Sequence, residues 1–273
     1  MKNLCNKALL LALLSLLFML PAAAAQLPVV NWSPNVFSID DGKGGHLLTN
    51  AGRQEIANAV SRQLHALQQS GKLPFKLKEV STETNIQDDM EEPLGLIPIV
   101  VADMSLDSQY SIDGKTYHKA TVISGLDLAF CRMNEKMGSW KILGTIPLRY
   151  YGVLGADPAH PILDDISPEA KSQEYIRITS QGIGQGVDFQ RQKAVLRHLN
   201  KKTLDNEPAW QVVDVKFGSA KAKEVFAGRG QILKNIVAGF FTSSYQKKTQ
   251  RIVYPALTLD GWKKDVVRNL YSL

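Results

Sequence analysis

Apolar residues at helical spacing predict a helix over residues 50–70. Four of them recur at i, i+4, i+8 and i+11, on one side of such a helix: Ile56, Val60, Leu64 and Leu67. We expect Asn50 to cap the first amides and Gly71 to end the helix, because glycine readily adopts the left-handed backbone that follows many helices. Residues 75–80 then alternate between apolar and charged side chains, as a half-buried strand does.

A pair of strand-like runs joined by Asp113-Gly114 is the clearest structural signal in the chain. The runs cover residues 97–112 and 115–132. An Asp-Gly pair favours a type I′ hairpin turn, because both central residues of that turn need a positive φ. With a further strand expected over residues 140–151, the pattern predicts a three-stranded antiparallel meander with one buried face.

The second half of the chain mixes helices and strands. Prolines and aspartates cluster over residues 153–173, which we interpret as a linker or loop between two halves, residues 26–152 and 174–273. The other expected elements are strands at 175–179, 210–217 and 251–254 and helices at 187–202, 231–247 and 262–270. This order predicts the α+β class, an antiparallel three-stranded meander packed with amphipathic helices.

The helix expected over residues 231–247 has a broad apolar stripe, typical of a core-facing helix. Its apolar positions are Ile232, Leu233, Ile236, Val237, Phe240, Phe241 and Tyr245. We expect Phe240 to face the core and Thr242 to face water. A membrane-surface or ligand segment is not predicted here, because a surface-lying membrane helix has more lysine and arginine along its polar face.

Residues 1–25 have the three parts of a secretory signal peptide. Two lysines precede an apolar run over residues 8–20, which is too short for a membrane span of roughly 20 residues. Ala23 and Ala25 occupy the positions where the peptidase accepts only small side chains, so we expect cleavage before Gln26. The mature protein is then exported, periplasmic or extracellular, with no membrane span. The alternative is an uncleaved anchor.

The formal charge of +6 includes two lysines of the signal, which leaves the mature chain at about +4. The basic residues are spread along the chain, so a nucleic-acid binder is not indicated, but the balance favours contact with anionic lipid or polysaccharide surfaces. Of the two cysteines, Cys5 falls in the signal, which leaves Cys131 without an intramolecular partner. We expect Cys131 to be a buried structural thiol.

Two short motifs suggest chemistry but lack the residues that the chemistry needs. Gly182, Gly184 and Gly186 resemble a phosphate-binding loop without the G-x-G-x-x-G spacing, so we interpret them as a flexible turn before a helix. Ser244 and Lys247 match S-x-x-K, in which a lysine activates a serine, but the companion S-x-N and K-T-G motifs are absent. We therefore assign neither a cofactor nor a catalytic residue.

Acidic and histidine side chains gather in two loops. Asp40, Asp41 and His46 surround a glycine turn, and Asp157 and His160 share a proline-rich loop. Either set could hold a divalent cation if a third ligand came from elsewhere, but neither has a recognised ligand spacing. No metal site is assigned.

Residues 50–150 resemble domains of two envelope protein families. The likeness rests on a helix, turn and strand in LHALQQSGKLPFKLKEV, then on the strand and hairpin segments IPIVVADMSLDSQY and YHKATVISGLDLAFCRMNEKMGSWKILGTIPL. This order is similar to the periplasmic core of the curli secretion channel family and the N-terminal domain of the TolB family. The chain has no lipid-attachment cysteine after the signal and no pair of long alternating hairpins for a membrane barrel. The resemblance thus implies an envelope α+β binding domain, not a secretion pore.

The export signal and the lack of a catalytic constellation predict a non-catalytic binding or assembly module of the cell envelope. Its partner is an envelope protein or polymer. The alternative is an exported hydrolase with a site between the two halves, near residues 153–190, where Asp157, His160, Asp164 and Asp165 lie. A deep cleft that brings one of these residues against another segment would favour the enzyme, and a shallow face would favour binding.

Overall fold

The computed structural model describes residues 27–32, 34–38, 47–79, 94–134, 139–155, 161–187, 189, 210–212, 214–225, 230–249 and 253–254. Two predictions lie outside the described residues: the signal with its cleavage site, and the helix at 262–270. Nearly all of the helix predicted at 187–202 also lies outside them, as do the two loops considered as cation sites.

The main sheet has six strands in the order β3-β1-β4-β5-β6, with β2 paired to β4. Their bounds are β1 Val29–Trp32, β2 Phe37–Ser38, β3 Lys76–Glu79, β4 Leu94–Ile112, β5 Lys115–Asn134 and β6 Ser139–Leu154. Strands β4, β5 and β6 pair antiparallel, whereas β1 and β2 pair parallel to β4, and β1 pairs parallel to β3. The sheet is therefore mixed.

The α+β class is confirmed, but the predicted three-stranded antiparallel meander is not matched, because β4, β5 and β6 belong to a mixed six-stranded sheet. The three added strands are two to four residues long, so their side chains do not repeat often enough to show a period of two. The parallel pairing also depends on the helix between β1 and β3, which returns the chain in the same direction. Tertiary contacts, rather than local pattern, thus complete the sheet.

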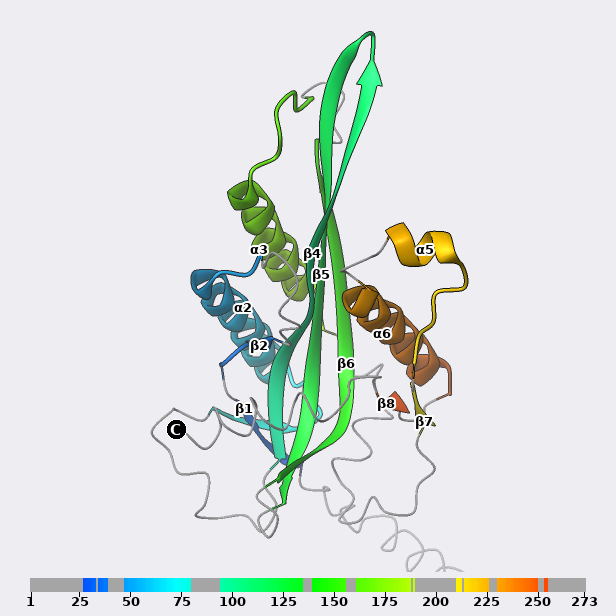
Figure 1. Ribbon diagram of the computed structural model, residues 1–273. Coiled ribbons are helices and arrows are strands. Elements are labelled where there is room, and N and C mark those ends of the chain that lie inside the picture. The colour runs from blue at the N-terminus through cyan, green and yellow to red at the C-terminus, as the bar shows by residue number, and fades with distance from the viewer. Residues whose placement is uncertain are drawn as a thin grey trace, which may run out of the picture.

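The β4–β5 hairpin turns where the sequence predicts. Ile112 pairs with Lys115, and the two residues between them both have positive φ, 50° at Asp113 and 74° at Gly114. These values are those of the I′ family of turns, which matches the right-handed twist of the strands. The end of the hairpin extends as an arm beyond the helices (Figure 1).

Helices α2, Asn50–Gln69, and α3, Pro168–Gly184, cover one face of the sheet (Figure 1). The predicted helix at 50–70 is confirmed, with its cap one residue earlier than expected. The Thr49 hydroxyl, not the Asn50 side chain, accepts a hydrogen bond from the Gly52 amide at 3.0 Å. Gly71 follows the helix with φ 67°, in the left-handed conformation that the sequence predicts.

The strand predicted at 175–179 is wrong, because these residues lie within α3. The alternation of Tyr175, Ile176, Arg177 and Ile178 has a period of two only over a very short stretch. Over the longer span, the buried residues Tyr175, Ile178, Thr179 and Ile183 recur at i, i+3, i+4 and i+8, which is the helical pattern. Ser167 caps this helix by accepting a hydrogen bond from the Ala170 amide at 3.1 Å.

The main core lies between the sheet and helices α2 and α3. Three aromatic rings meet edge to face at its centre, with centroids 5.7 Å apart for Phe75 and Phe130 and 5.6 Å apart for Phe75 and Phe189. Trp32 from β1 and Tyr175 from α3 belong to the same buried cluster. Segments on both sides of the predicted linker at 153–173 therefore contribute to one core.

The opposite face of the sheet carries α6, Gly230–Thr249, which contacts β4 and β6. The predicted helix at 231–247 is thus confirmed in position. The shorter elements near it are β7, Trp210–Gln211, α5, Ala220–Val225, and β8, Val253–Tyr254. Strands β7 and β8 pair parallel to each other, so the predicted strands at 210–217 and 251–254 are shorter than expected.

Candidate binding surface

Helix α6 is turned so that much of its apolar side faces away from the sheet. Phe240 and Phe241 are 57% and 52% exposed, and Val237 is also half exposed. Thr242, by contrast, is completely buried. The prediction that Phe240 faces the core and Thr242 faces water is therefore wrong.

The reason for this orientation is a buried ion pair on the sheet beneath α6. Arg149 of β6 donates a hydrogen bond from Nη1 to Asp127 Oδ1 of β5 at 2.6 Å, and the same nitrogen is 2.8 Å from the carbonyl oxygen of Leu148. Any Cβ at Gly239 of α6 would overlap the Arg149 guanidinium. The helix consequently packs over the arginine with a glycine.

Beside Ile236, which packs against Ala102 and Met104, part of the inner face of α6 is small or polar. Gly239, Thr242 and Gln246 recur at i, i+3 and i+7, and all are buried. The Gln246 amide nitrogen donates to the Val253 carbonyl at 3.3 Å, which ties α6 to β8. Because only a glycine fits over the Arg149 guanidinium, this stripe faces the sheet, although Thr242 Oγ1 and Gln246 Oε1 have no hydrogen-bond partner among the described residues.

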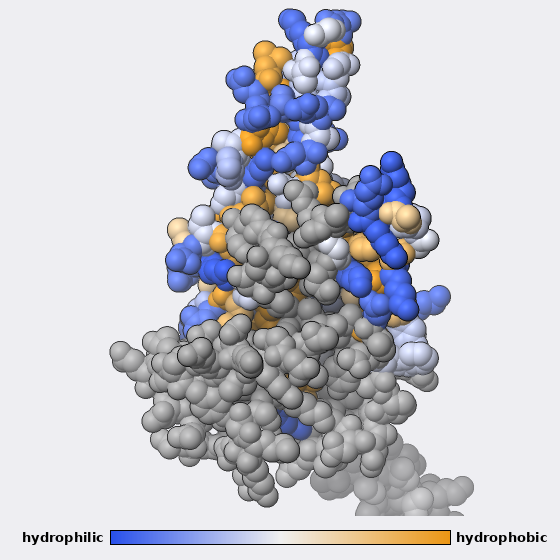
Figure 2. All heavy atoms as spheres, viewed as in Figure 1, coloured by the Kyte–Doolittle hydropathy of each residue, from blue (hydrophilic) through white to orange (hydrophobic). Residues whose placement is uncertain are grey.

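On the outer side, five side chains form one apolar surface, which we call the aromatic surface: Trp210, Val237, Phe240, Phe241 and Tyr245. The ring of Tyr245 lies 5.6 Å from that of Phe241 and 5.8 Å from that of Trp210. Val237 is one helical turn from both phenylalanines, so the five side chains are contiguous. Figure 2 shows hydrophobic residues exposed among hydrophilic ones on the side where Figure 1 places α5 and α6.

The charged groups around the aromatic surface are mostly basic. Lys247 and Lys248 are exposed in the last turn of α6. Lys234, near the start of the helix, contacts the exposed Asp214 with an Nζ–Oδ1 distance of 3.0 Å. The hydrogen bond from Lys234 lowers the pKa of Asp214. The carboxylate of Asp214 is therefore already paired.

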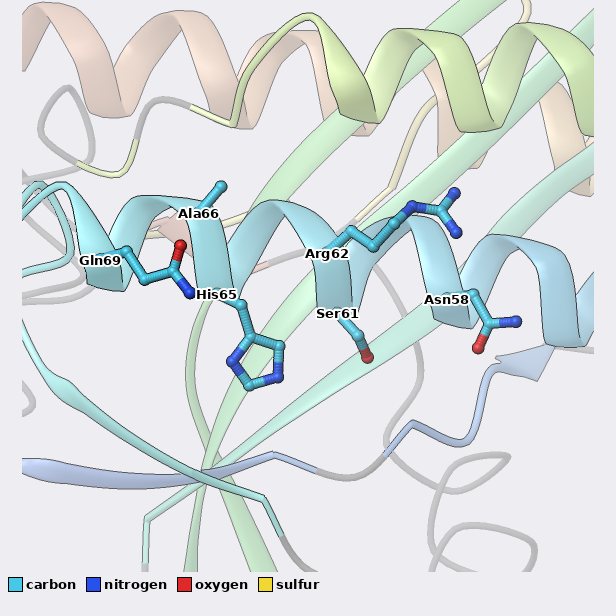
Figure 3. A pocket seen from close by; sticks show the side chains of 6 residues that line it. All are labelled: Asn58, Ser61, Arg62, His65, Ala66 and Gln69. Atoms are coloured by element: carbon cyan, nitrogen blue, oxygen red, sulfur yellow. The ribbon is translucent and has the colours of Figure 1, made fainter.

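A shallow depression on α2 is a second place to consider. Its volume is about 430 Å³, and it is lined by Asn58, Ser61, Arg62, His65, Ala66 and Gln69. All six residues belong to one helix face, and Figure 3 shows Arg62 extending away from His65. Ser61 accepts a hydrogen bond from the Trp32 indole at 2.8 Å, and His65 Nε2 lies 3.5 Å from Glu79 Oε2. Ser61 and His65 therefore link α2 to β1 and β3. The six side chains that line the depression do not converge on a common point (Figure 3).

Two of the four polar residues considered for a hydrolase site are described. Asp164 and Asp165 are exposed in the segment before α3. Asp165 Oδ1 lies 2.8 Å from Nδ1 of His118 on β5, and its side chain is 91% exposed. The His118 amide also donates to the Ile162 carbonyl at 2.9 Å. This arrangement attaches the segment to the strand at the surface, outside any deep cleft that the structure describes.

The two sequence motifs have structural positions. Gly182 and Gly184 lie in the last turns of α3, so the flexible turn predicted there is wrong for these two glycines. Gly186 follows α3 with φ 129°, and nearly all of the helix predicted after it lies outside the described residues. A Cβ at Gly182 would overlap the Tyr150 ring, which gives this glycine a packing role. Ser244 and Lys247 are both exposed on α6.

Cys131 on β5 is a buried free thiol. Burial raises the pKa of the Cys131 thiol to about 12, so the thiol is neutral and buried as predicted. Within those ranges, no group of three or more His, Cys, Asp or Glu side chains is placed to hold a metal ion. No helix among them is long and apolar enough to cross a membrane.

Comparisons with solved structures include two distant similarities. No protein-family model and no curated protein matches the chain. A neuraminyllactose-binding hemagglutinin homolog from Helicobacter pylori is 14% identical, with a TM-score of 0.34, over 61% of this chain and 84% of that one. A hypothetical protein, CT253 from Chlamydia trachomatis, is 13% identical, with a TM-score of 0.29, over 58% of this chain and 95% of that one.

Both TM-scores lie below 0.5, so these similarities carry no functional argument. Neither protein is a curli secretion channel or a TolB domain, and the resemblance to those two families stays a prediction.

The aromatic surface is the feature that the sequence pattern missed. A signal for it was present in the small and polar residues Gly239, Thr242 and Gln246, which share one side of the helix.

Proposed function

We propose that this protein is an exported, non-catalytic binding module of the cell envelope and that the aromatic surface is its binding site. The observation that carries the proposal is the orientation of α6. Its polar stripe is buried, and Val237, Phe240 and Phe241 are left half exposed or more. Contiguous apolar surface rimmed by charge is typical of interaction sites, and aromatic residues are enriched in them.

The hydrolase alternative has less support. The contact between His118 and Asp165 joins two segments, as an active site would, but the carboxylate is almost fully exposed. The position of Asp165 at the surface therefore favours a structural tie.

Co-sedimentation of the purified protein with an isolated cell-envelope fraction tests the proposal. Phe241→Asp removes apolar surface without emptying the core and should weaken binding at least about tenfold, as loss of a central interface aromatic does. Ile112→Asp is the matched control, since Ile112 is 52% exposed like Phe241 but lies at the tip of the hairpin arm. Equal binding by the two variants would exclude the aromatic surface.

A hydrolase screen of the same protein tests the alternative. Turnover that Asp165→Asn abolishes would replace the binding proposal with the enzyme. An unchanged rate in that variant would show that any turnover comes from another site or from a contaminant.

A further inference from the structure

The aromatic surface continues directly into basic residues on the same side of α6. Lys248 follows Phe241 by seven residues, and Lys247 follows Phe240 by seven residues, which is close to two full turns. All four side chains are exposed. The outer side of the helix thus has an apolar part and a basic part about 10 Å apart along its axis.

We propose that the occupant of this surface is a bilayer containing anionic lipid, on which α6 lies parallel to the membrane plane. This inference rests on the proposed function and names the partner of the same site. Val237, Phe240 and Phe241 would enter the boundary between headgroups and acyl chains. Lys247 and Lys248 would contact the anionic headgroups, which is the usual arrangement of interfacial helices.

The aromatic residues at the edge of the surface fit the same occupant. Trp210 is half exposed, and its ring contacts that of Tyr245. Tryptophan and tyrosine prefer the headgroup level of a membrane, because each has an apolar ring with a polar atom that stays hydrated. The surface therefore combines apolar, interfacial and basic side chains.

Charge distinguishes this occupant from a second copy of the chain. Residues 210–249 contain seven lysines and arginines and two acidic residues, and one of the two, Asp214, is paired with Lys234. Two such surfaces facing each other would bring like charges together, which opposes association. An uncharged polysaccharide has neither an apolar interior for the phenylalanines nor a charge for the lysines.

The expectation that α6 is not a membrane-surface helix depended on the small number of lysines along its polar face. In the folded protein that polar stripe is buried over the sheet, at Thr242 and Gln246. The face available to a membrane is the apolar one, and its basic charge is at the end of the helix. The expectation from the lysine count therefore applies to an isolated amphipathic helix and not to α6, whose polar stripe is buried in the folded protein.

Vesicle co-sedimentation tests the inference with the full exported protein. The probes are vesicles of equal parts phosphatidylethanolamine and phosphatidylglycerol, and vesicles of phosphatidylcholine alone. We expect binding to the anionic vesicles to be about tenfold tighter or more, and to weaken as salt is raised. Phe241→Asp should abolish it, and a double variant with Lys247→Glu and Lys248→Glu should remove the preference for anionic lipid.

Ile112→Asp should bind vesicles like the wild type, and unchanged thermal unfolding of every variant shows that the fold is intact. Binding to the envelope fraction without binding to anionic vesicles would overturn the lipid inference but leave the proposed function standing. Absence of both would overturn both. Self-association that Phe241→Asp abolishes, without vesicle binding, would identify a second copy as the occupant and overturn the inference.

Discussion

Two substitutions one helical turn apart test the orientation of α6. Ile236 and Phe240 are both apolar and are spaced i, i+4, so the sequence places them on one helical line. In the structure Ile236 is 8% exposed and Phe240 is 57% exposed. The four-residue step rotates about 40° around the axis, which is enough to move a side chain from the buried edge to solvent.

The expected losses of unfolding free energy follow from these exposures. Complete burial of a phenylalanine side chain contributes about 1.5–3 kcal/mol, and less than half of Phe240 is buried. Phe240→Ala should therefore cost about 1 kcal/mol or less. Ile236→Ala removes a nearly buried side chain and leaves a cavity, so it should cost about 2–5 kcal/mol.

Urea denaturation of the two variants and the wild type measures both losses. Leu64→Ala in α2 is a reference for an ordinary core cavity, since Leu64 is fully enclosed. Its loss should resemble that of Ile236→Ala. A loss for Phe240→Ala equal to or greater than that for Ile236→Ala would show that α6 presents its aromatic side to the sheet and would remove the basis of the aromatic surface.

Four further outcomes are expected. Asp127→Ala should lower the unfolding free energy by about 3–5 kcal/mol in urea denaturation, because Arg149 stays buried without its counter-ion. The double variant Asp127→Leu, Arg149→Met removes both charges, and a smaller loss for Asp127→Ala than for this double variant would contradict the prediction. Gly239→Val should cost about 1–3 kcal/mol by the same measurement, because its Cβ overlaps the Arg149 guanidinium, and an unchanged midpoint would place α6 elsewhere. Burial raises the pKa of Cys131 to about 12, so iodoacetamide should label it at pH 8 only after unfolding. Since the unfolded thiol ionises first, its contribution to stability should decline as the pH rises from about 9 toward 12, and Cys131→Ala should remove that decline.

The helices and the hairpin could be predicted from the sequence where the pattern extends over several turns or a specific turn is required. Helix α2 has four apolar residues at helical spacing, and the hairpin has an Asp-Gly turn whose residues both need positive φ. Residues 175–179 were predicted as a strand because five residues are too few to distinguish the two-residue period of a strand from the 3.6-residue period of a helix. Its true period is visible only over all of α3.

The candidate site was harder to predict than the elements that form it. The chain itself determines that residues 230–249 are helical, since apolar positions at helical spacing stabilise a helix in any surroundings. The sequence does not determine which side of that helix is buried, because apolar residues cover more than half of its circumference.

The tertiary structure decides that orientation. Asp127 and Arg149 lie on different strands, and only their pairing across β5 and β6 creates the buried charge that Gly239 covers. The parallel addition of β1 and β2 and the contact of Asp165 with His118 likewise join residues far apart in the chain. Local pattern therefore determined where the elements lie, and the polar groups that the fold brings together decided which side of α6 was left to bind.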